Sequence, residues 1–461
     1  MTRDFTKGAI TKQIFLFAIP FLIGNLFQQL YSIVDMLIVG RTINSTAYAA
    51  VGSTSSIIWF TSGAIQAMTV GFSAVAARFF GANDEEGIKR TFASASKFSA
   101  LISITLATVC VIFADKILVL IRTPAELFDY AYEYVVWIFA GLLATAFFNL
   151  LSNMIRSIGD SRTPLYFLII ACVVNIILDY LFIVVFEMKT AGAGLATVIA
   201  QLLSGLLCLV YIVKKHPLLH MRLKHFKLDV KLDLLVLKLG IPMAFLNMVL
   251  SVGAIIVQFV TNDFGELYIF AYATGSKIEN FLIQPIISFG SALAVFVSQN
   301  LGAMQYKRIL TGVWRTILMC CLWCVLAALI LLPFGKLIIS VIGGKGLTQD
   351  MIDYSYRYVL IHTVFTLILT VLVICKSALQ AVGRNVFAVT SGFTEILARA
   401  GVAMLVVYLT SRLILNENDG FSLVCMCNPT AWFVGAVTVL PDYIVMKVKY
   451  NKLQREQDSI A

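Results

Sequence analysis

Residues 14–39 read IFLFAIPFLIGNLFQQLYSIVDMLIV, a nearly unbroken apolar run that decides the class of fold. A helix needs about 20 apolar residues to cross the hydrocarbon core of a bilayer, and this run exceeds that length. It nevertheless contains one carboxylate, Asp35. An acidic side chain at the centre of a membrane helix costs about 2.5–3.5 kcal/mol on insertion scales, so Asp35 is a candidate functional residue.

The composition of the whole chain is that of a membrane protein with many spans. Its 461 residues are 60% hydrophobic and 13% charged, whereas soluble domains carry about 25% charged residues. The first run is too long for the apolar region of a cleaved signal peptide. We therefore predict an all-α polytopic membrane protein with twelve transmembrane helices in two pseudo-symmetric six-helix lobes. The spans are expected near residues 13–39, 47–77, 93–121, 129–155, 164–187, 191–213, 239–262, 268–298, 312–342, 354–382, 386–411 and 429–447.

The Lys and Arg residues between the runs indicate the orientation. They gather on one side of the expected membrane, in the loops and at the adjoining ends of the apolar runs, as the positive-inside rule requires of the cytoplasmic side. They are Arg3, Lys7, Lys12, Arg78, Lys89, Arg90, Lys97, Arg156, Arg162, Lys214, Lys215, Arg222, Lys224, Lys227, Lys231, Lys238, Lys307, Arg308, Arg315, Lys376, Arg384, Lys447, Lys449, Lys452 and Arg455. An even number of spans then places both termini in the cytoplasm, with the protein in the cell membrane. The net charge of +10 follows from this topology and does not indicate nucleic-acid binding.

The two halves of the chain resemble each other in sequence. The basic loop at 214–238 divides the expected helices six and six, which predicts an N-lobe over residues 1–222 and a C-lobe over residues 223–461. Three pairs of stretches match in the same order and at a nearly constant offset along the chain. They are AIPFLIGN (18–25) with GIPMAFLN (240–247), RFFGANDEEGIKR (78–90) with QNLGAMQYKR (299–308), and RSIGDSR (156–162) with LQAVGRN (379–385). Parallel repeats of this kind are typical of transporters that alternate access to a central site.

Features that occur in both halves are interpreted as structural. Features that occur in one half only are candidates for a functional role. Pro20 matches Pro242, and each removes a backbone hydrogen bond where a helix can bend. Pro20 is therefore a candidate hinge. Asp35, by contrast, falls opposite Val257, and Asp179 falls opposite about Ala403.

The N-lobe runs carry a set of polar residues at similar depth. Gln28 lies seven residues before Asp35 and Asn175 lies four before Asp179, so each pair shares a helix face. Thr197 is expected at the same depth in the sixth span. Oxygen ligands of this kind suit Na⁺, and two neighbouring carboxyl groups out of water can equally share a proton. The alternative is that the two aspartates only cap helix ends at the membrane interface.

The C-lobe runs carry charged pairs. Lys277 and Glu279 occur in GSKIENF, and Glu395 and Arg399 occur in TEILARAG at a spacing that suits a salt bridge within one helix. Both pairs are expected to face the protein interior, because charge exposed to lipid is costly. They are interpreted either as a structural charge network or as contacts to a substrate or on a proton path.

The sequence lacks the motifs of common enzymes and metal sites. It contains no HExxH and no nucleophile elbow of the GxSxG type, so an enzyme is not predicted. Cys321 and Cys324 form a CxxC inside an apolar run with no His nearby, and we interpret them as core residues. Three histidines lie in the basic loop without metal-ligand spacing, and His362 is expected to be alone in its helix. No cofactor other than a coupling ion is expected.

Four stretches carry a resemblance to a known family. They are LFQQLYSIVDMLIVGR (26–41), NIILDY (175–180), GAGLATVIAQ (192–201) and SQNLGA (298–303). From about Lys12 to Lys449, the chain resembles the multidrug and toxic compound extrusion (MATE) transporters, in the branch near the bacterial DinF and NorM-type proteins. The resemblance implies twelve helices in two lobes around a V-shaped cavity. It also implies export of cationic or amphipathic drugs or toxic organic compounds, driven by Na⁺ or H⁺ antiport.

The resemblance further implies a cation or proton site in the N-lobe. Its residues here are Asp35, Asn175, Asp179 and Thr197, with Gln28 nearby and an asparagine of the fourth helix, Asn149 or Asn153. Pro20 matches the proline at which the first helix is proposed to bend on protonation. NorM-type members also carry an acidic residue in the seventh helix, and residues 242–259 contain none here. The N-lobe is therefore the preferred site, with Glu279 and Glu395 as substitutes in the C-lobe.

Two other functions stay open. A flippase for lipid-linked oligosaccharide or a related amphiphile would need a more basic central cavity, and Lys277 and Arg399 are the only intramembrane cations expected. A passive channel would show flux without a coupled gradient. The expected partners are a small organic cation or amphipathic substrate and the lipid bilayer, and the chain is expected to act as a monomer.

Overall fold

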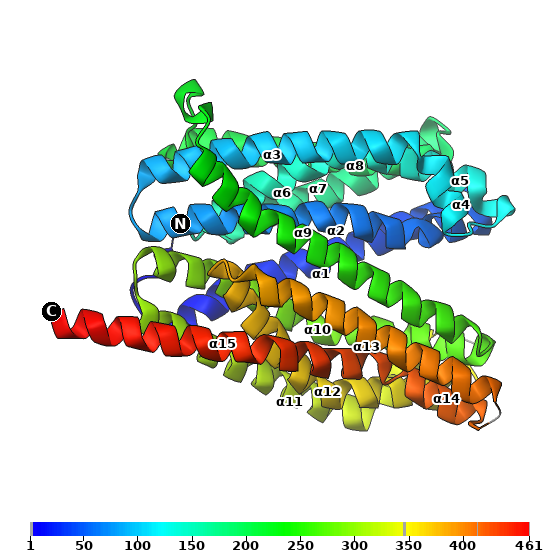
Figure 1. Cartoon of the computed structure of the whole chain (residues 1–461). Helices are drawn as coiled ribbons and strands as arrows, with labels where there is room; N and C mark the ends of the chain where they lie inside the picture. The colour runs from blue at the N-terminus through cyan, green and yellow to red at the C-terminus, as the bar shows by residue number, and fades with distance from the viewer. Residues whose placement is uncertain (1–2, 344–346, 413, 461) are drawn as a thin grey trace. The chain divides into compact units, whose positions relative to one another are not determined.

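The computed structural model describes residues 3–343, 347–412 and 414–460, and its regular structure over these ranges is entirely helical (Figure 1). Eleven of the described helices are long and apolar enough to cross a membrane. A twelfth span is formed by α5 (Ala125–Ala140) and α6 (Leu142–Ser157), which are bent by 46° at their junction. This confirms the predicted all-α polytopic fold with twelve transmembrane helices.

The spans coincide with the apolar runs of the sequence. Besides the α5–α6 pair they are α1 (Ile10–Thr42), α2 (Ser45–Gly81), α3 (Glu85–Ile112), α7 (Arg162–Tyr180) with the π-helical turn η1 (Leu181–Val185), α8 (Lys189–Lys215), α9 (Val230–Asn262), α10 (Glu266–Gly302), α11 (Tyr306–Gly343), α12 (Gln349–Ala381), α13 (Asn385–Ser411) and α15 (Cys427–Ile460). Shorter elements connect them: α4 (Ala114–Leu120), α14 (Glu417–Val424), and the 3-10 turns η2 (Pro217–Leu219) and η3 (Leu223–Phe226).

The loops that match in sequence also share an unusual backbone conformation. Asn83 and Met304, which align in the second matched pair of stretches, have φ values of 57° and 55°. Gly159 and Gly383, which align in the third pair, have φ values of 86° and 81°. The left-handed region is unfavourable for a side chain such as that of Met. Its recurrence at equivalent positions therefore shows that the repeat extends from sequence to loop geometry.

Contacts divide the chain into two compact units. Unit 1 consists of the segments Met1–Gly8, Ile19–Met248 and Ser298–Met304. Unit 2 consists of the segments Ala9–Ala18, Val249–Val297 and Gln305–Ala461. The units thus differ from the expected lobes, since α1 and α9 each contribute to both and the border does not fall at residue 222.

The first half of α9 belongs to unit 1 because it is held to α3. Asp233 of α9 accepts hydrogen bonds from Lys97 Nζ at 3.1 Å and from the hydroxyl of Ser94. Leu232 and Val236, on the same part of α9, are buried in the apolar core of unit 1. Polar and apolar contacts of α9 therefore both extend unit 1 beyond the basic loop.

Each unit is built around buried apolar side chains of its own helices. In unit 1, one cluster includes Phe72 and Phe92, and a second includes Phe139. In unit 2, one cluster includes Tyr268 and Phe421. Large apolar side chains also remain exposed along the spans, as expected of helices that face lipid.

Two glycines of the matched loops allow backbones to approach closely within unit 1. A Cβ atom at Gly81 would lie 1.8 Å from the carbonyl oxygen of Gln299, and one at Gly302 would lie 1.8 Å from that of Arg78. We expect Gly81→Ala to lower the midpoint temperature of thermal unfolding, because rigid backbone would have to move. Overpacking of this kind costs about 1–3 kcal/mol. Thermal unfolding of the purified protein in detergent measures the effect.

Gly401→Ala is the matched control, because no atom lies within 4 Å of the position of its Cβ. Alanine favours a helix over glycine by roughly 0.5–1 kcal/mol, so this variant should unfold at the same temperature or slightly higher. Equal midpoints for the two variants would contradict the close approach at Gly81.

Candidate functional site

Two carboxyl groups meet in the interior of unit 1. Asp35 lies on α1 and is 3% exposed, and Asp179 lies at the end of α7 and is fully buried. Their side chains are within hydrogen-bonding reach of each other. The π-helical turn η1 begins two residues after Asp179, and such interruptions of helices are frequent at functional sites.

Amide and hydroxyl groups surround the two carboxyls. Tyr134 of α5 donates a hydrogen bond to Asp35 Oδ2 at 3.1 Å. The side-chain amide of Asn175, oriented so that both its ends are satisfied, donates to Asp179 Oδ2 at 3.0 Å and accepts from the backbone N–H of Thr197 at 3.2 Å. These bonds tie three helices, α1, α7 and α8, and the α5 tyrosine into one polar cluster.

Tyr31 completes this cluster on the α1 side. Its hydroxyl donates to Thr197 Oγ1 at 2.7 Å, one turn before Asp35 on the same helix. Thr197 therefore accepts from α1 with its side chain while its backbone N–H is bound by α7. We call Tyr31, Asp35, Tyr134, Asn175, Asp179 and Thr197 the carboxyl cluster.

Among the residues that the structure describes, the carboxyl cluster has no basic counter-ion. Within the described ranges, none of the groups in contact with either carboxyl is a Lys, Arg or His. No donor among the described residues reaches Oδ1 of Asp35 or Oδ1 of Asp179. A buried charge without a partner is strongly unfavourable, and two like charges side by side are more so. The arrangement is therefore suited to a proton or a small cation held between the two groups.

Two of the residues expected at this site lie elsewhere. Gln28 is exposed on α1. It lies about 10 Å along the helix axis from Asp35, because seven residues of a helix rise that far.

The expected asparagine of α6, Asn153, also lies outside the cluster. It donates to Thr69 Oγ1 at 3.0 Å and accepts from Arg156 at 3.2 Å. The other asparagine considered, Asn149, donates to the carbonyl of Thr145 in its own helix. Of the α5–α6 pair, it is α5 that supplies a residue to the cluster, through Tyr134.

Tyr134 is a member of the site that sequence reasoning missed, although the sequence contains a signal for it. DYAYEYV at 129–135 matches DYSYRYV at 353–359, in the same register as Gly159 and Gly383. Tyr358, the equivalent of Tyr134, donates to Glu279 Oε2 at 2.5 Å. Both halves thus present an equivalent tyrosine to a buried carboxyl, although the carboxyl comes from α1 in one half and from α10 in the other.

The expected C-lobe charge network consists of two separate clusters within unit 2. Glu279 contacts Tyr358, and His362 Nε2 lies 3.8 Å from Glu279 Oε2 while its ring stacks on Tyr358. His362 is the single histidine of α12, as the sequence suggested, but it lies against a carboxyl group. Lys277 is exposed and joins neither cluster.

The second cluster in unit 2 corrects the placement of a lysine. Lys376, which the charge pattern assigns to the cytoplasmic side and not to the intramembrane cations, is 8% exposed and pairs with Glu395 at 2.6 Å. Arg399 lies 4.0 Å from the other oxygen of Glu395 and donates to Asn428 Oδ1 at 3.0 Å. The carboxylate thus has two basic neighbours, which distinguishes it from the carboxyls of unit 1.

In unit 2, the residues equivalent to the two aspartates of the carboxyl cluster are apolar. Val257 and Ala403 are both 1% exposed and lie in the same buried apolar cluster. The carboxyl pair therefore belongs to one half of the repeat only. No group of three His, Cys, Asp or Glu that could hold a metal ion occurs among the described residues.

Comparisons with known proteins identify the family. The MatE family profile matches residues 20–181 and again residues 242–405, so the two matches begin at the equivalent prolines Pro20 and Pro242, in register with the repeat. "Probable multidrug resistance protein YoeA" of Bacillus subtilis is 30% identical over 326 residues, covering 68% of this chain and 70% of that protein. "Probable multidrug resistance protein YpnP" of the same organism is 28% identical over 306 residues, covering 66% and 68%.

A solved structure has the same fold. A MOP superfamily transporter from Pyrococcus furiosus aligns with a TM-score of 0.87 at 19% identity, covering 98% of each chain. The fold and the family match together define a multi-pass membrane transporter and not an enzyme. The chain belongs to the MatE family, that of the MATE transporters.

Proposed function

We propose that this protein is a secondary antiporter that exports cationic or amphipathic organic compounds in exchange for Na⁺ or H⁺. The observation that carries the proposal is the carboxyl cluster: two buried carboxyl groups in contact, with no basic residue beside them among the described residues. Such a pair needs a mobile positive charge, and an antiporter obtains its driving force from the gradient of an ion that it binds on one side of the membrane and releases on the other.

Coupling follows if the cation and the exported compound favour different conformations. A bound cation removes the repulsion between Asp35 and Asp179, so it stabilises a conformation in which α1 and α7 stay together. Loss of the cation weakens that conformation. A ligand shifts an equilibrium only by its difference in affinity for the two states. Pro20, which lies inside α1 on the same helix as Asp35, is the proposed point at which the helix bends.

The names of the relatives support the substrate class, and the charge pattern supports the location. YoeA and YpnP are described as multidrug resistance proteins, which favours export of organic drugs by this chain. The excess of Lys and Arg in one set of loops favours a cell-membrane protein with both termini in the cytoplasm. We further propose that it acts as a monomer and requires no cofactor besides the coupling ion.

Uptake of ethidium into inverted membrane vesicles tests the proposal. With Na⁺ and H⁺ gradients imposed separately, one of them should drive uptake by the wild-type protein. Asp35→Asn and Asp179→Asn should each lower that uptake at least tenfold, because a neutral amide neither repels its neighbour nor holds the cation. Asp115→Asn is the control, since Asp115 is an exposed carboxylate of unit 1.

Uptake that persists unchanged in both aspartate variants would exclude the carboxyl cluster as the coupling site. If neither gradient drives uptake of any organic cation, drug export loses its main support. The flippase for a lipid-linked oligosaccharide then becomes the leading function. Flux that needs no gradient would indicate a channel.

Substitution of the two equivalent tyrosines tests which unit carries the coupling. Tyr134→Phe removes the hydrogen bond to Asp35 without changing the bulk of the side chain, and Tyr358→Phe does the same for Glu279. We expect Tyr134→Phe to reduce gradient-driven ethidium uptake several-fold more than Tyr358→Phe does, measured in the same vesicles at equal protein levels. A larger effect of Tyr358→Phe would move the coupling site to Glu279 and His362 of unit 2.

A further inference from the structure

The segment that joins α8 to α9 forms a basic pocket with α3 in unit 1. The pocket has a volume of about 480 Å³, in the range of small-ligand sites. Its lining carries four Lys or Arg side chains and one carboxylate. The lining residues are Arg90, Lys224, His225, Lys227, Leu228, Asp229, Val230 and Lys231.

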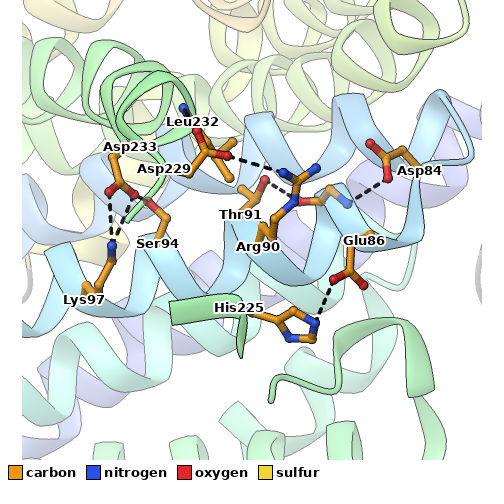
Figure 2. A network of polar contacts seen from close by, with 11 residues as sticks. Asp84, Glu86, Arg90, Thr91, Ser94, Lys97, His225, Asp229, Leu232 and Asp233 are labelled. Atoms are coloured by element: carbon orange, nitrogen blue, oxygen red, sulfur yellow. Dashed lines mark hydrogen bonds and ion pairs between the residues drawn. The ribbon is translucent and has the colours of Figure 1, made fainter. Parts of the chain in front are cut away.

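A network of polar contacts fixes one wall of this pocket (Figure 2). Arg90 of α3 lies 3.4 Å from Asp229, and Glu86 lies 3.0 Å from Lys224 Nζ and 3.1 Å from His225 Nε2. His225 is buried, and its Nδ1 accepts from the backbone N–H of Arg222 at 2.9 Å. The turn η3 is therefore held against α3 by contacts of Glu86 with Lys224 and His225.

Two of the four Lys and Arg side chains remain available. Arg90 and Lys224 are already paired with carboxylates. Lys227 and Lys231 are exposed, and neither has an ion-pair partner in the part of the chain that the structure describes. Two unpaired ammonium groups on one pocket attract an anion.

Apolar side chains next to these lysines are unusually exposed. Leu223 is 91% exposed and Leu228 is 79% exposed, and Val230 beside them is 57% exposed. The segment joins the end of one span, α8, to the start of the next, α9, and we infer that it lies in the membrane interface. Segments that lie in that interface insert apolar side chains among the lipid tails while their lysines reach the phosphates.

We propose that this pocket binds the phosphate head group of an anionic phospholipid. Lys227 and Lys231 hold the phosphate, while Leu223 and Leu228 contact the adjoining acyl chains. A free phosphate ion would satisfy the lysines alone and would leave the leucines in water, so the exposed leucines favour a lipid. Basic pockets beside membrane helices are known to bind such head groups. The site is independent of the carboxyl cluster and of the proposed antiport.

Native mass spectrometry of the full-length protein in detergent tests the site, with phosphatidylglycerol or phosphatidylcholine added at equal concentrations. The wild-type protein should retain phosphatidylglycerol preferentially. Lys227→Ala/Lys231→Ala should reduce that retention on the order of tenfold, and Lys227→Arg/Lys231→Arg should restore it. Lys447→Ala/Lys449→Ala is the matched control, because it removes two exposed lysines from the C-terminal half of α15, away from the pocket lining.

Leu228→Ser separates a lipid from a free anion. This substitution should weaken the retention of phosphatidylglycerol several-fold. Inorganic phosphate, compared with chloride at the same ionic strength, should not stabilise the wild-type protein or any of the variants. Equal retention of the two lipids, or unchanged retention in the double-alanine variant, would overturn the proposal. Stabilisation by inorganic phosphate that Lys227→Ala/Lys231→Ala abolishes, with Leu228→Ser unaffected, would show an ion site instead.

Discussion

The carboxyl groups of Asp35 and Asp179 interact in the interior of unit 1, with no basic residue beside them among the described residues. Both groups are buried, and the surrounding Tyr134, Asn175 and Thr197 supply hydrogen bonds but no positive charge. Such an arrangement is unstable if both groups are ionised and nothing is bound between them. Its energy therefore changes sharply when a cation arrives or leaves, which is the property that a coupled transporter needs.

The two halves of the repeat share loop conformations and a tyrosine–carboxyl contact, but they differ in the buried charged residues that surround it. Loop conformations recur at Asn83 and Met304, and a tyrosine faces a carboxyl at both 134 and 358. The carboxyl pair itself has no counterpart, since the equivalent positions in unit 2 belong to an apolar cluster. The buried glutamates of unit 2 have His, Lys or Arg beside them. Among the described residues, only unit 1 therefore leaves a pair of buried acids to be neutralised from outside.

The sequence predicts those features that depend on one helix at a time. Span positions follow from hydropathy, and the depth of Asp35 and Asp179 follows from their place in their spans. The contacts of Asn153 and Lys376 were missed because they depend on how one helix is rotated against another, which periodicity does not give. The position of Tyr134 could have been predicted from the sequence, because its motif recurs at 353–359 in register with the repeat.

Infrared difference spectroscopy of the purified protein in lipid tests the central claim most directly, since it detects protonated carboxyl groups by their C=O absorption. If the two carboxyls share a proton when no other cation is bound, a protonated-carboxyl band should appear near neutral pH and disappear in Asp35→Asn/Asp179→Asn. If Na⁺ is the coupling ion, adding Na⁺ should remove the band in the wild-type protein; if H⁺ is the coupling ion, Na⁺ should leave it unchanged. A spectrum without such a band, and without any Na⁺-dependent change that the double variant abolishes, would contradict a cation held between the two carboxyls.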